Sequence, residues 1–107
     1  MPFRLVSADG QLSFELRAGT PLVLGRALSS DLPVLDPTVS RRHAELVIEP
    51  SAVQLRDLGS SNGTFVNGTR ITSSTRLRMG DRVVFGKISF ELLELSHVLI
   101  DDKSAEV

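Results

Sequence analysis

Polar and apolar side chains alternate without interruption through residues 11–17, and this period of two predicts a strand with one buried face. Weaker alternation recurs at residues 3–6, 22–24, 44–48, 53–55, 83–85 and 88–92. Turn-forming pairs such as Asp9-Gly10, Glu49-Pro50 and Gly86-Lys87 separate these stretches. No window long enough for a helix keeps a 3.6-residue period, so the pattern predicts an all-β sandwich of many short strands.

Two Asn-Gly pairs, Asn62-Gly63 and Asn67-Gly68, predict successive tight hairpin turns, because Asn and Gly tolerate the positive φ angles that such turns require. Residues 26–39 are rich in Ser, Pro and Asp and lack alternation. We therefore expect long loops there, at one end of the sandwich. Loops on a rigid scaffold commonly carry binding sites.

The C-terminal stretch differs from the rest of the chain. Residues 1–90 hold 11 basic and 8 acidic side chains, whereas residues 91–107 hold 1 basic and 5 acidic ones. Strand alternation also ends near residue 95. We expect one domain over residues 1–95, followed at residues 96–107 by an acidic segment that is either a frayed tail or the start of a linker within a larger protein.

The composition narrows the possible chemistry. The chain of 107 residues has no Cys and two His, which excludes disulfides and thiol nucleophiles and leaves too few ligands for a transition-metal site. We expect neither a metal nor a cofactor. The longest apolar runs are three residues and no signal-peptide pattern opens the chain, so we expect no membrane association and a cytoplasmic location.

The basic residues are mostly arginines. Ten of the 12 Lys and Arg residues are Arg, although the net charge is only −1. The planar guanidinium fork suits phosphate and carboxylate groups. A nucleic-acid partner is disfavoured, because the basic excess is small and neither Tyr nor Trp is present to stack on bases. Arg76, Arg78 and Arg82 are expected to form a solvated face at a sheet edge.

Four short motifs follow one another along the chain. They are Gly25-Arg26 at the end of a predicted strand, Ser-Arg-Arg-His at residues 40–43, Gly-Ser-Ser-Asn-Gly-Thr at 59–64 and Val-Asn-Gly at 66–68. Their order and spacing resemble the forkhead-associated (FHA) domain family, whose pattern is Gly-Arg, Ser-x-x-His, Ser-x-Asn-Gly-Thr and Asn-Gly. The resemblance covers residues 3 to about 95 and implies a β-sandwich of two mainly antiparallel sheets with about eleven strands.

The same resemblance implies a phosphothreonine-dependent protein-protein interaction module without catalytic activity. The partner would be a protein that a Ser/Thr kinase has phosphorylated, and the module is expected to be monomeric. A phosphothreonine carries roughly −1.5 to −2 charges and three strong acceptor oxygens, so its receptor needs cations and several converging donors.

The resemblance also assigns roles to individual residues. Arg26 would be the main guanidinium on the phosphate, Arg41 a second cation, and Ser40 and Ser61 hydroxyl donors to phosphate oxygens. Arg41 is preferred to Arg42 because adjacent residues of an extended segment point to opposite sides.

The remaining residues of the pattern have less direct roles. Asn62 would bind the main chain of the peptide, and Asn67 would hold the loop or touch the peptide. Four residues would support the site structurally: Gly25, His43, Gly63 and Gly68. Members of the family commonly recognise the residue three positions after the phosphothreonine, and the uncharged Thr38, two residues before Ser40, predicts no strong preference for an acidic residue there.

Two other functions stay open beside this hypothesis. A sandwich could bind its partner through a phosphate-independent face and use the same loops only as scaffold. A hydrolase that uses Ser40 and His43 is disfavoured, because residues three apart in an extended segment lie on opposite faces and no carboxylate is placed to orient the imidazole.

Overall fold

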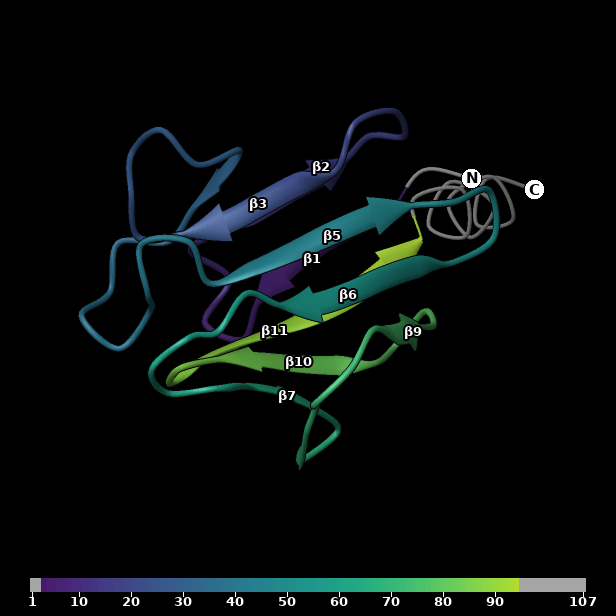
Figure 1. Cartoon of the computed structure of the whole chain (residues 1–107). Coiled ribbons are helices and arrows are strands. Elements are labelled where there is room, and N and C mark those ends of the chain that lie inside the picture. Colours follow the sequence, from purple (N-terminus) through teal and green to yellow (C-terminus); the bar gives the residue numbers. More distant parts are fainter. Residues whose placement is uncertain (1–2, 95–107) are drawn as a thin grey trace.

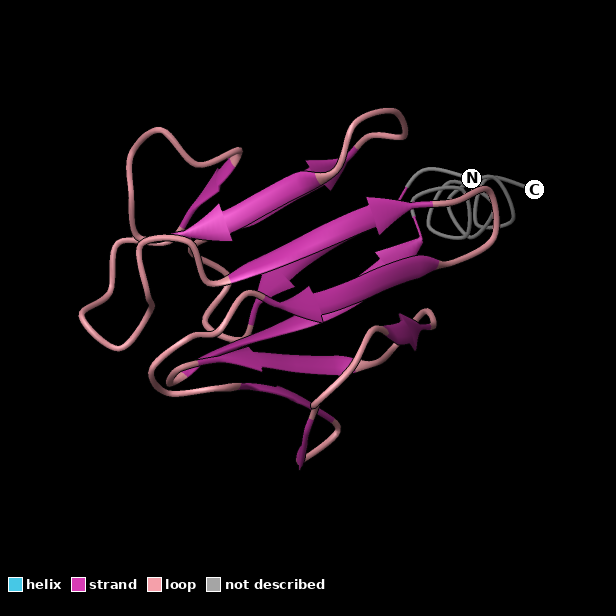
Figure 2. Ribbon diagram, viewed as in Figure 1, coloured by secondary structure: helices cyan, strands magenta, loops and turns pink. Residues whose placement is uncertain are grey.

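Eleven short strands form two sheets within residues 3–94, the part of the chain that the computed structural model describes (Figure 1). This part contains no helix (Figure 2), and hence none that could span a membrane. The segment predicted at residues 96–107 lies outside the described residues. The strands are β1 (Phe3–Ser7), β2 (Ser13–Leu16), β3 (Leu22–Gly25), β4 (Leu32–Pro33), β5 (Ala44–Ile48), β6 (Val53–Asp57), β7 (Thr64–Val66), β8 (Thr69–Arg70), β9 (Thr75–Leu77), β10 (Arg82–Phe85) and β11 (Ile88–Glu94).

The two sheets are mainly antiparallel. One sheet has the strand order β2-β1-β11-β10-β7-β8, and the other has the order β4-β3-β5-β6-β9. Every strand pair for which a register is known is antiparallel except β3 with β4. The predicted all-β sandwich of two mainly antiparallel sheets is confirmed.

Alternation along the strands builds the core between the sheets. In β1, Phe3 and Leu5 are buried, while Arg4 and Val6 are only half-buried on the outer face. The rings of Phe85 and Phe90 meet edge to face in the core, with centroids 5.7 Å apart. Each large apolar side chain buried in this way contributes about 1.5–3 kcal/mol to the free energy of unfolding. Val34 and Val39 of the β4–β5 connection are buried in the same core, so they anchor that loop to the scaffold.

Most predicted strands are present and the shortest ones were missed. The predicted strand at 44–48 coincides with β5, and those at 3–6, 22–24, 53–55, 83–85 and 88–92 agree with β1, β3, β6, β10 and β11 within two residues. The stretch 11–17 is strand only over Ser13–Leu16, at a sheet edge. β4, β7, β8 and β9 have two or three residues each, too few for a period of two to be visible.

The two Asn-Gly pairs have different structures. Asn67 and Gly68 have φ angles of 49° and 88° and form the two-residue turn between β7 and β8, as predicted. The hairpin predicted at Asn62-Gly63 is wrong. This pair lies between β6 and β7, which belong to different sheets, so the segment crosses from one sheet to the other.

The loops gather at one end of the sandwich. The β3–β4, β4–β5, β6–β7 and β10–β11 connections lie together at the left in Figure 1. Backbone contacts join two of them, because the Gly86 N–H donates to the Gly63 carbonyl over 3.1 Å. Residues 26–39 form long loops as expected, interrupted only by the two-residue strand β4. Four connections therefore share one surface.

Gly25 lets the β3–β4 loop lie directly against the β4–β5 loop. A methyl group added at Gly25 would lie 1.9 Å from the Arg41 carbonyl oxygen and 2.7 Å from its carbonyl carbon. Next to it, the Arg26 N–H donates to the Ser40 carbonyl over 2.9 Å. The contact is between two backbones, so no side chain can move aside to admit a larger residue.

We expect Gly25→Ala to lower the free energy of unfolding by about 2 kcal/mol or more, because the overpacked segment at residues 40–42 must shift. Urea unfolding measures this loss. Gly10→Ala is the matched control, since the added methyl meets nothing within 4 Å and only the positive φ of 75° is unfavourable, at a cost of about 1 kcal/mol. Wild-type stability in Gly25→Ala would contradict the close backbone packing.

Candidate functional site

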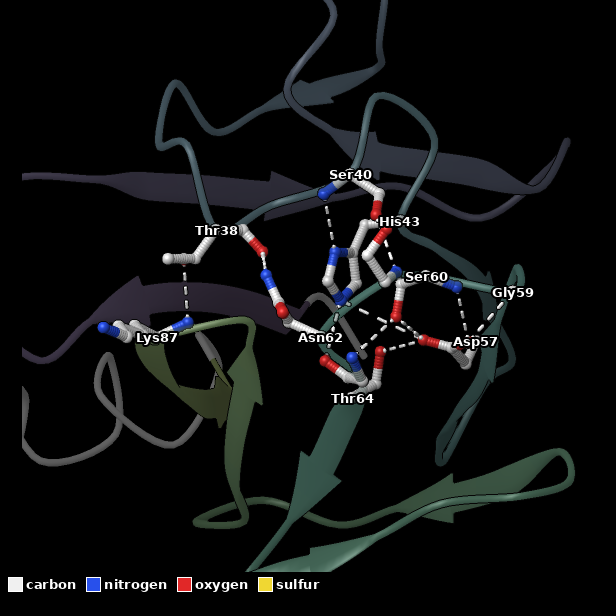
Figure 3. Close-up of polar contacts among 11 residues, drawn as sticks. Thr38, Ser40, His43, Asp57, Gly59, Ser60, Asn62, Thr64 and Lys87 are labelled. Carbon is white, nitrogen blue, oxygen red and sulfur yellow. Dashed lines mark hydrogen bonds and ion pairs between the residues drawn. The ribbon is translucent and has the colours of Figure 1, made fainter.

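The imidazole of His43 joins two of the clustered loops from within the core (Figure 3). His43 is fully buried. Its Nδ1 accepts the Ser40 N–H over 3.0 Å, so the ring hydrogen is on Nε2, which donates to the Gly63 carbonyl over 2.9 Å. The ring also packs edge to face on Phe85, with centroids 5.8 Å apart. One side chain thus fixes the position of Ser40 relative to the β6–β7 loop.

The carboxylate of Asp57 closes the β6–β7 loop on itself (Figure 3). Its Oδ2 accepts the N–H groups of Gly59 and Ser60, each over 2.9 Å. Its Oδ1 accepts the hydroxyls of Ser60 and Thr64 over 2.6 and 2.7 Å. The Ser60 hydroxyl in turn accepts the Gly63 N–H over 3.0 Å. Sequence reasoning missed Asp57 and Ser60, because only the folded loop brings their polar atoms together.

These hydrogen bonds decide the charge of Asp57. Partial burial alone raises the pKa of its carboxyl group. The hydrogen bonds from the Ser60 and Thr64 side chains and from the loop N–H groups outweigh the burial, so the pKa lies below its ordinary value. Asp57 is therefore ionised at neutral pH, and its charge strengthens the bonds that hold the loop.

Arg26, Ser40 and Ser61 meet at the surface of the loop cluster. The Arg26 Nε–H donates to the Val39 carbonyl over 2.9 Å, and no other residue of 3–94 accepts a hydrogen bond from the guanidinium. The Ser61 N–H donates to the Ser40 Oγ over 3.0 Å, which leaves the hydrogen of that hydroxyl free to donate. The Arg26 and Ser61 side chains are exposed and Ser40 is half-buried. Free donors therefore converge on one exposed surface.

Asn62 extends this surface towards the β10–β11 turn. Its Nδ2 donates to the Thr38 carbonyl over 2.8 Å, while its Oδ1 accepts no hydrogen bond within residues 3–94. The Thr38 hydroxyl donates to Asp36 and accepts the Lys87 N–H over 3.0 Å. Figure 3 shows Thr38 between Asn62 and Lys87.

The contact between Thr38 and Lys87 could not be predicted from the sequence. The Thr38 hydroxyl is hydrogen-bonded to Asp36 and to the Lys87 N–H. This agrees with the expectation that Thr38 selects no acidic residue three positions after the phosphothreonine, and that expectation stays a prediction. The spacing of residues gave no signal that Lys87, 49 residues further along the chain, contacts Thr38. The hydrogen bonds from Thr38 and the nearby charge of Lys87 lower the pKa of Asp36.

Arg41 and Arg42 are both exposed, and they lie in a bend rather than in a strand. The alternation that favoured Arg41 over Arg42 is therefore absent. The backbone carbonyl of Arg41 accepts the Ala27 N–H over 3.3 Å, which holds the bend against the β3–β4 loop. Both arginines follow Ser40 directly in the chain, and exposure does not distinguish one from the other as the second cation.

Asn67 and Gly68 belong to the β7–β8 turn. The Asn67 Nδ2 donates to Asp81 over 3.1 Å, and its Oδ1 accepts the Arg82 N–H over 3.0 Å. Both polar ends of this side chain therefore tie the turn to the start of β10. Within residues 3–94, no side-chain hydrogen bond joins Asn67 to Arg26 or Ser40.

Ser40 and His43 do not form a nucleophile and base pair. It is the backbone N–H of Ser40, and not its hydroxyl, that contacts the imidazole. A carboxylate oxygen, Asp57 Oδ1, lies 4.0 Å from Nε2, but no hydrogen bond joins the two, so this carboxylate does not orient the imidazole. That nitrogen faces the Gly63 carbonyl, so the three side chains lack the order of a catalytic triad. Within residues 3–94, no three His, Asp or Glu side chains gather as a metal site.

The three arginines expected to form a solvated face at a sheet edge are all exposed, but they differ in position, and Arg78 lies just after β9. Arg76 lies on β9, at a sheet edge as predicted. Arg82 lies on β10, an interior strand between β11 and β7, so the predicted edge position is wrong for this residue.

Similar proteins are found by sequence and by structure. The model of the FHA domain family matches residues 22–86. The FHA domain-containing protein FhaB of Mycobacterium tuberculosis is 39% identical over 72 residues, which are 67% of this chain and 46% of FhaB. The glycogen accumulation regulator GarA of Mycolicibacterium smegmatis is 43% identical over 81 residues, 76% of this chain and 49% of GarA. The chain thus spans about half the length of these relatives.

A solved structure has the same fold. It comes from a study of phosphothreonine-dependent FHA domain interactions and matches with a TM-score of 0.81 at 29% identity, over 88% of this chain and 97% of the other. The family model covers more than half of the chain, and its range includes all four motifs. The resemblance predicted from those motifs is confirmed, and this protein belongs to the FHA domain family.

Proposed function

We propose that this FHA domain binds a phosphothreonine-containing segment of a partner protein that a Ser/Thr kinase has phosphorylated. The observation that carries the proposal is the convergence of Arg26, Ser40 and Ser61 on one exposed surface with free donors. No carboxylate in residues 3–94 forms an ion pair with Arg26. A site with cationic and hydroxyl donors and no internal counter-charge suits an external dianion.

The phosphate and the peptide backbone would use different parts of the site. The terminal nitrogens of Arg26 and the Ser40 hydroxyl would donate to phosphate oxygens, with Ser61 on a further oxygen and Arg41 as a second cation. The free Oδ1 of Asn62 suits a backbone N–H of the peptide. Charge-assisted hydrogen bonds contribute roughly 1.5–3 kcal/mol each before the peptide is ordered, so we expect a Kd of about micromolar.

The relatives support this assignment. The solved FHA structure at a TM-score of 0.81 comes from work on phosphothreonine-dependent interactions. We assign this chain the same dependence because its donors stand on loops that Asp57 and His43 hold in place. A receptor that is already ordered loses little conformational entropy on binding.

Other functions have less support from the geometry. A phosphate-independent module has no need for free donors at Arg26, Ser40 and Ser61, and treatment of the partner with phosphatase separates the two readings. Catalysis by Ser40 and His43 lacks the required hydroxyl-to-imidazole contact.

We further propose that the protein is a cytoplasmic monomer, in the compartment that kinases and their substrates share. We propose a protein rather than a nucleic acid as its partner, because the chain is nearly neutral.

Arg26→Ala is expected to weaken binding of a phosphothreonine peptide at least tenfold, because the main cation on the phosphate is lost. Fluorescence anisotropy measures the Kd, with unmodified and phosphoserine peptides beside it. Arg17→Ala is the control, since Arg17 is exposed at the opposite end of the sandwich and pairs only with Glu15 among residues 3–94. Equal affinity in wild type and Arg26→Ala, or an unfolded Arg26→Ala, would overturn the role of Arg26.

Asp57→Asn is expected to lower the free energy of unfolding by about 2 kcal/mol at pH 7, because an amide cannot accept hydrogen bonds from all four donors. Urea unfolding across pH gives a second test. A lowered folded pKa means that the contribution of Asp57 is complete above its ordinary pKa of 3.8 and is lost as pH falls through the folded value. The stability gap between wild type and Asp57→Asn should therefore stay constant from about pH 7 to 5 and narrow at lower pH.

Asp31→Asn serves as the matched control for this experiment. Asp31 is exposed and accepts one backbone N–H, from Val23 over 2.8 Å, so its loss is expected to cost less. A gap for Asp57→Asn that does not change down to about pH 3 would contradict the ionised hydrogen-bonded carboxylate.

A further inference from the structure

The guanidinium of Arg70 lies against the loop that carries Asn62. Arg70 is on the two-residue strand β8, two residues after the Val-Asn-Gly motif, and the four motifs assign it no role. A methyl group added at Gly63 would lie 2.8 Å from the Arg70 Nε and 3.0 Å from its Cζ. Gly63 has a φ of 89° and directly follows Asn62. The absence of a side chain at residue 63 thus leaves the space that the guanidinium occupies.

Arg70 has no partner for its guanidinium among the residues that the structure describes. Arg17 and Arg56 form ion pairs with Glu15 and Glu45, whereas Arg70 has neither an ion pair nor a side-chain hydrogen bond within residues 3–94. Its side chain is exposed. Since the guanidinium has five donors and no acceptor, an exposed Arg70 offers a ready contact to an anion that approaches the β6–β7 loop.

Strand β8 holds the Arg70 side chain at the surface. Thr69 and Arg70 are both exposed, so β8 adds no residue to the core. The β7–β8 turn is nevertheless firmly held, by the hydrogen bonds of Asn67 to Asp81 and Arg82. The Ile71 N–H also donates to the Thr64 carbonyl over 2.9 Å. A fixed hairpin with no buried residue of β8 holds the guanidinium over Gly63.

The distance along the loop sets which part of a ligand can reach Arg70. Gly63 lies two residues after Ser61, and two residues span at most about 7 Å. An extended peptide advances about 3.3–3.6 Å per residue. If Ser61 contacts the phosphate, a side chain one or two residues away from the phosphothreonine reaches the guanidinium.

We infer that Arg70 is a specificity-determining residue that selects phosphothreonine segments with a second anionic group one or two residues from the phosphothreonine. The anionic group is a carboxylate of Asp or Glu, or the phosphate of a second phosphorylated residue, since both suit the guanidinium fork. This inference rests on the proposed function. It concerns positions other than the third residue after the phosphothreonine, for which Thr38 predicts no acidic preference.

The test is an aspartate scan of one phosphothreonine peptide. The parent peptide is otherwise neutral, and four derivatives carry a single Asp one or two residues before or after the phosphothreonine. Anisotropy titrations give the ratio of neutral-peptide Kd to Asp-peptide Kd for wild type, Arg70→Gln and Arg76→Gln. Arg76 is the matched control, an exposed arginine on edge strand β9.

We expect Asp at one of these positions to tighten binding to wild type about fivefold, the scale of an exposed ion pair. The ratio should fall to about one in Arg70→Gln and persist in Arg76→Gln, and added salt should reduce it. Phosphoserine in place of that Asp gives the second arm, which separates a carboxylate preference from a phosphate preference. Arg70→Glu should reverse the preference towards a peptide with Lys at the same position.

The failures of the two proposals are distinguishable. A neutral phosphothreonine peptide that binds wild type, with no Asp derivative binding more tightly, would overturn the role of Arg70 alone. A gain from Asp that survives in Arg70→Gln would do the same. Thermal melting checks that each variant is folded. No binding of any phosphothreonine peptide by folded wild type would contradict the proposed function, and the inference with it.

Discussion

The buried imidazole of His43 is the contact on which the arrangement of the site depends. It accepts a backbone N–H from Ser40 on one side and donates to the Gly63 carbonyl on the other. These two residues belong to connections that lead to different sheets, so the ring sets the distance between the loops. Because the ring is fully buried, an unpaired nitrogen there would be costly, and the two loops have little freedom to separate.

The polar groups of the site fall into a buried set and an exposed set. Asp57, Ser60 and Thr64 satisfy one another within the β6–β7 loop, and no buried side-chain nitrogen or oxygen of residues 3–94 lacks a partner. The exposed groups, by contrast, keep free donors and acceptors at Arg26 and Asn62. An internally satisfied frame beneath unsatisfied surface groups is what a receptor needs in order to bind an anion with little reorganisation. The same contrast applies to Arg70, whose charge has no partner in the described part of the chain.

Most of the scaffold can be predicted from the sequence, but only part of the site can. Alternation locates the longer strands, because one face of each is buried, but strands of two or three residues such as β4 and β8 show no period. The Asn-Gly signal predicts the backbone angles at Asn67-Gly68, where both residues have a positive φ, but at Asn62-Gly63 only the glycine does. It also cannot tell a hairpin from a crossing between sheets, which depends on the partners of β6 and β7. The four motifs identify the family, and they name Arg26 and Ser40 through a resemblance rather than through chemistry. Contacts between distant residues, such as Lys87 with Thr38 or Arg70 with Gly63, depend on the fold and leave no local pattern.

The most direct test of the account is an NMR titration of the labelled domain with a phosphothreonine peptide and with its unmodified counterpart. The account predicts that only the phosphorylated peptide shifts the backbone amides of Arg26, Ser40, Ser61 and Asn62, while the amides of the β2–β3 and β5–β6 turns at the opposite end stay unchanged. Shifts that do not depend on the phosphate, or that lie on the outer face of either sheet, would contradict a phosphothreonine site at the clustered loops.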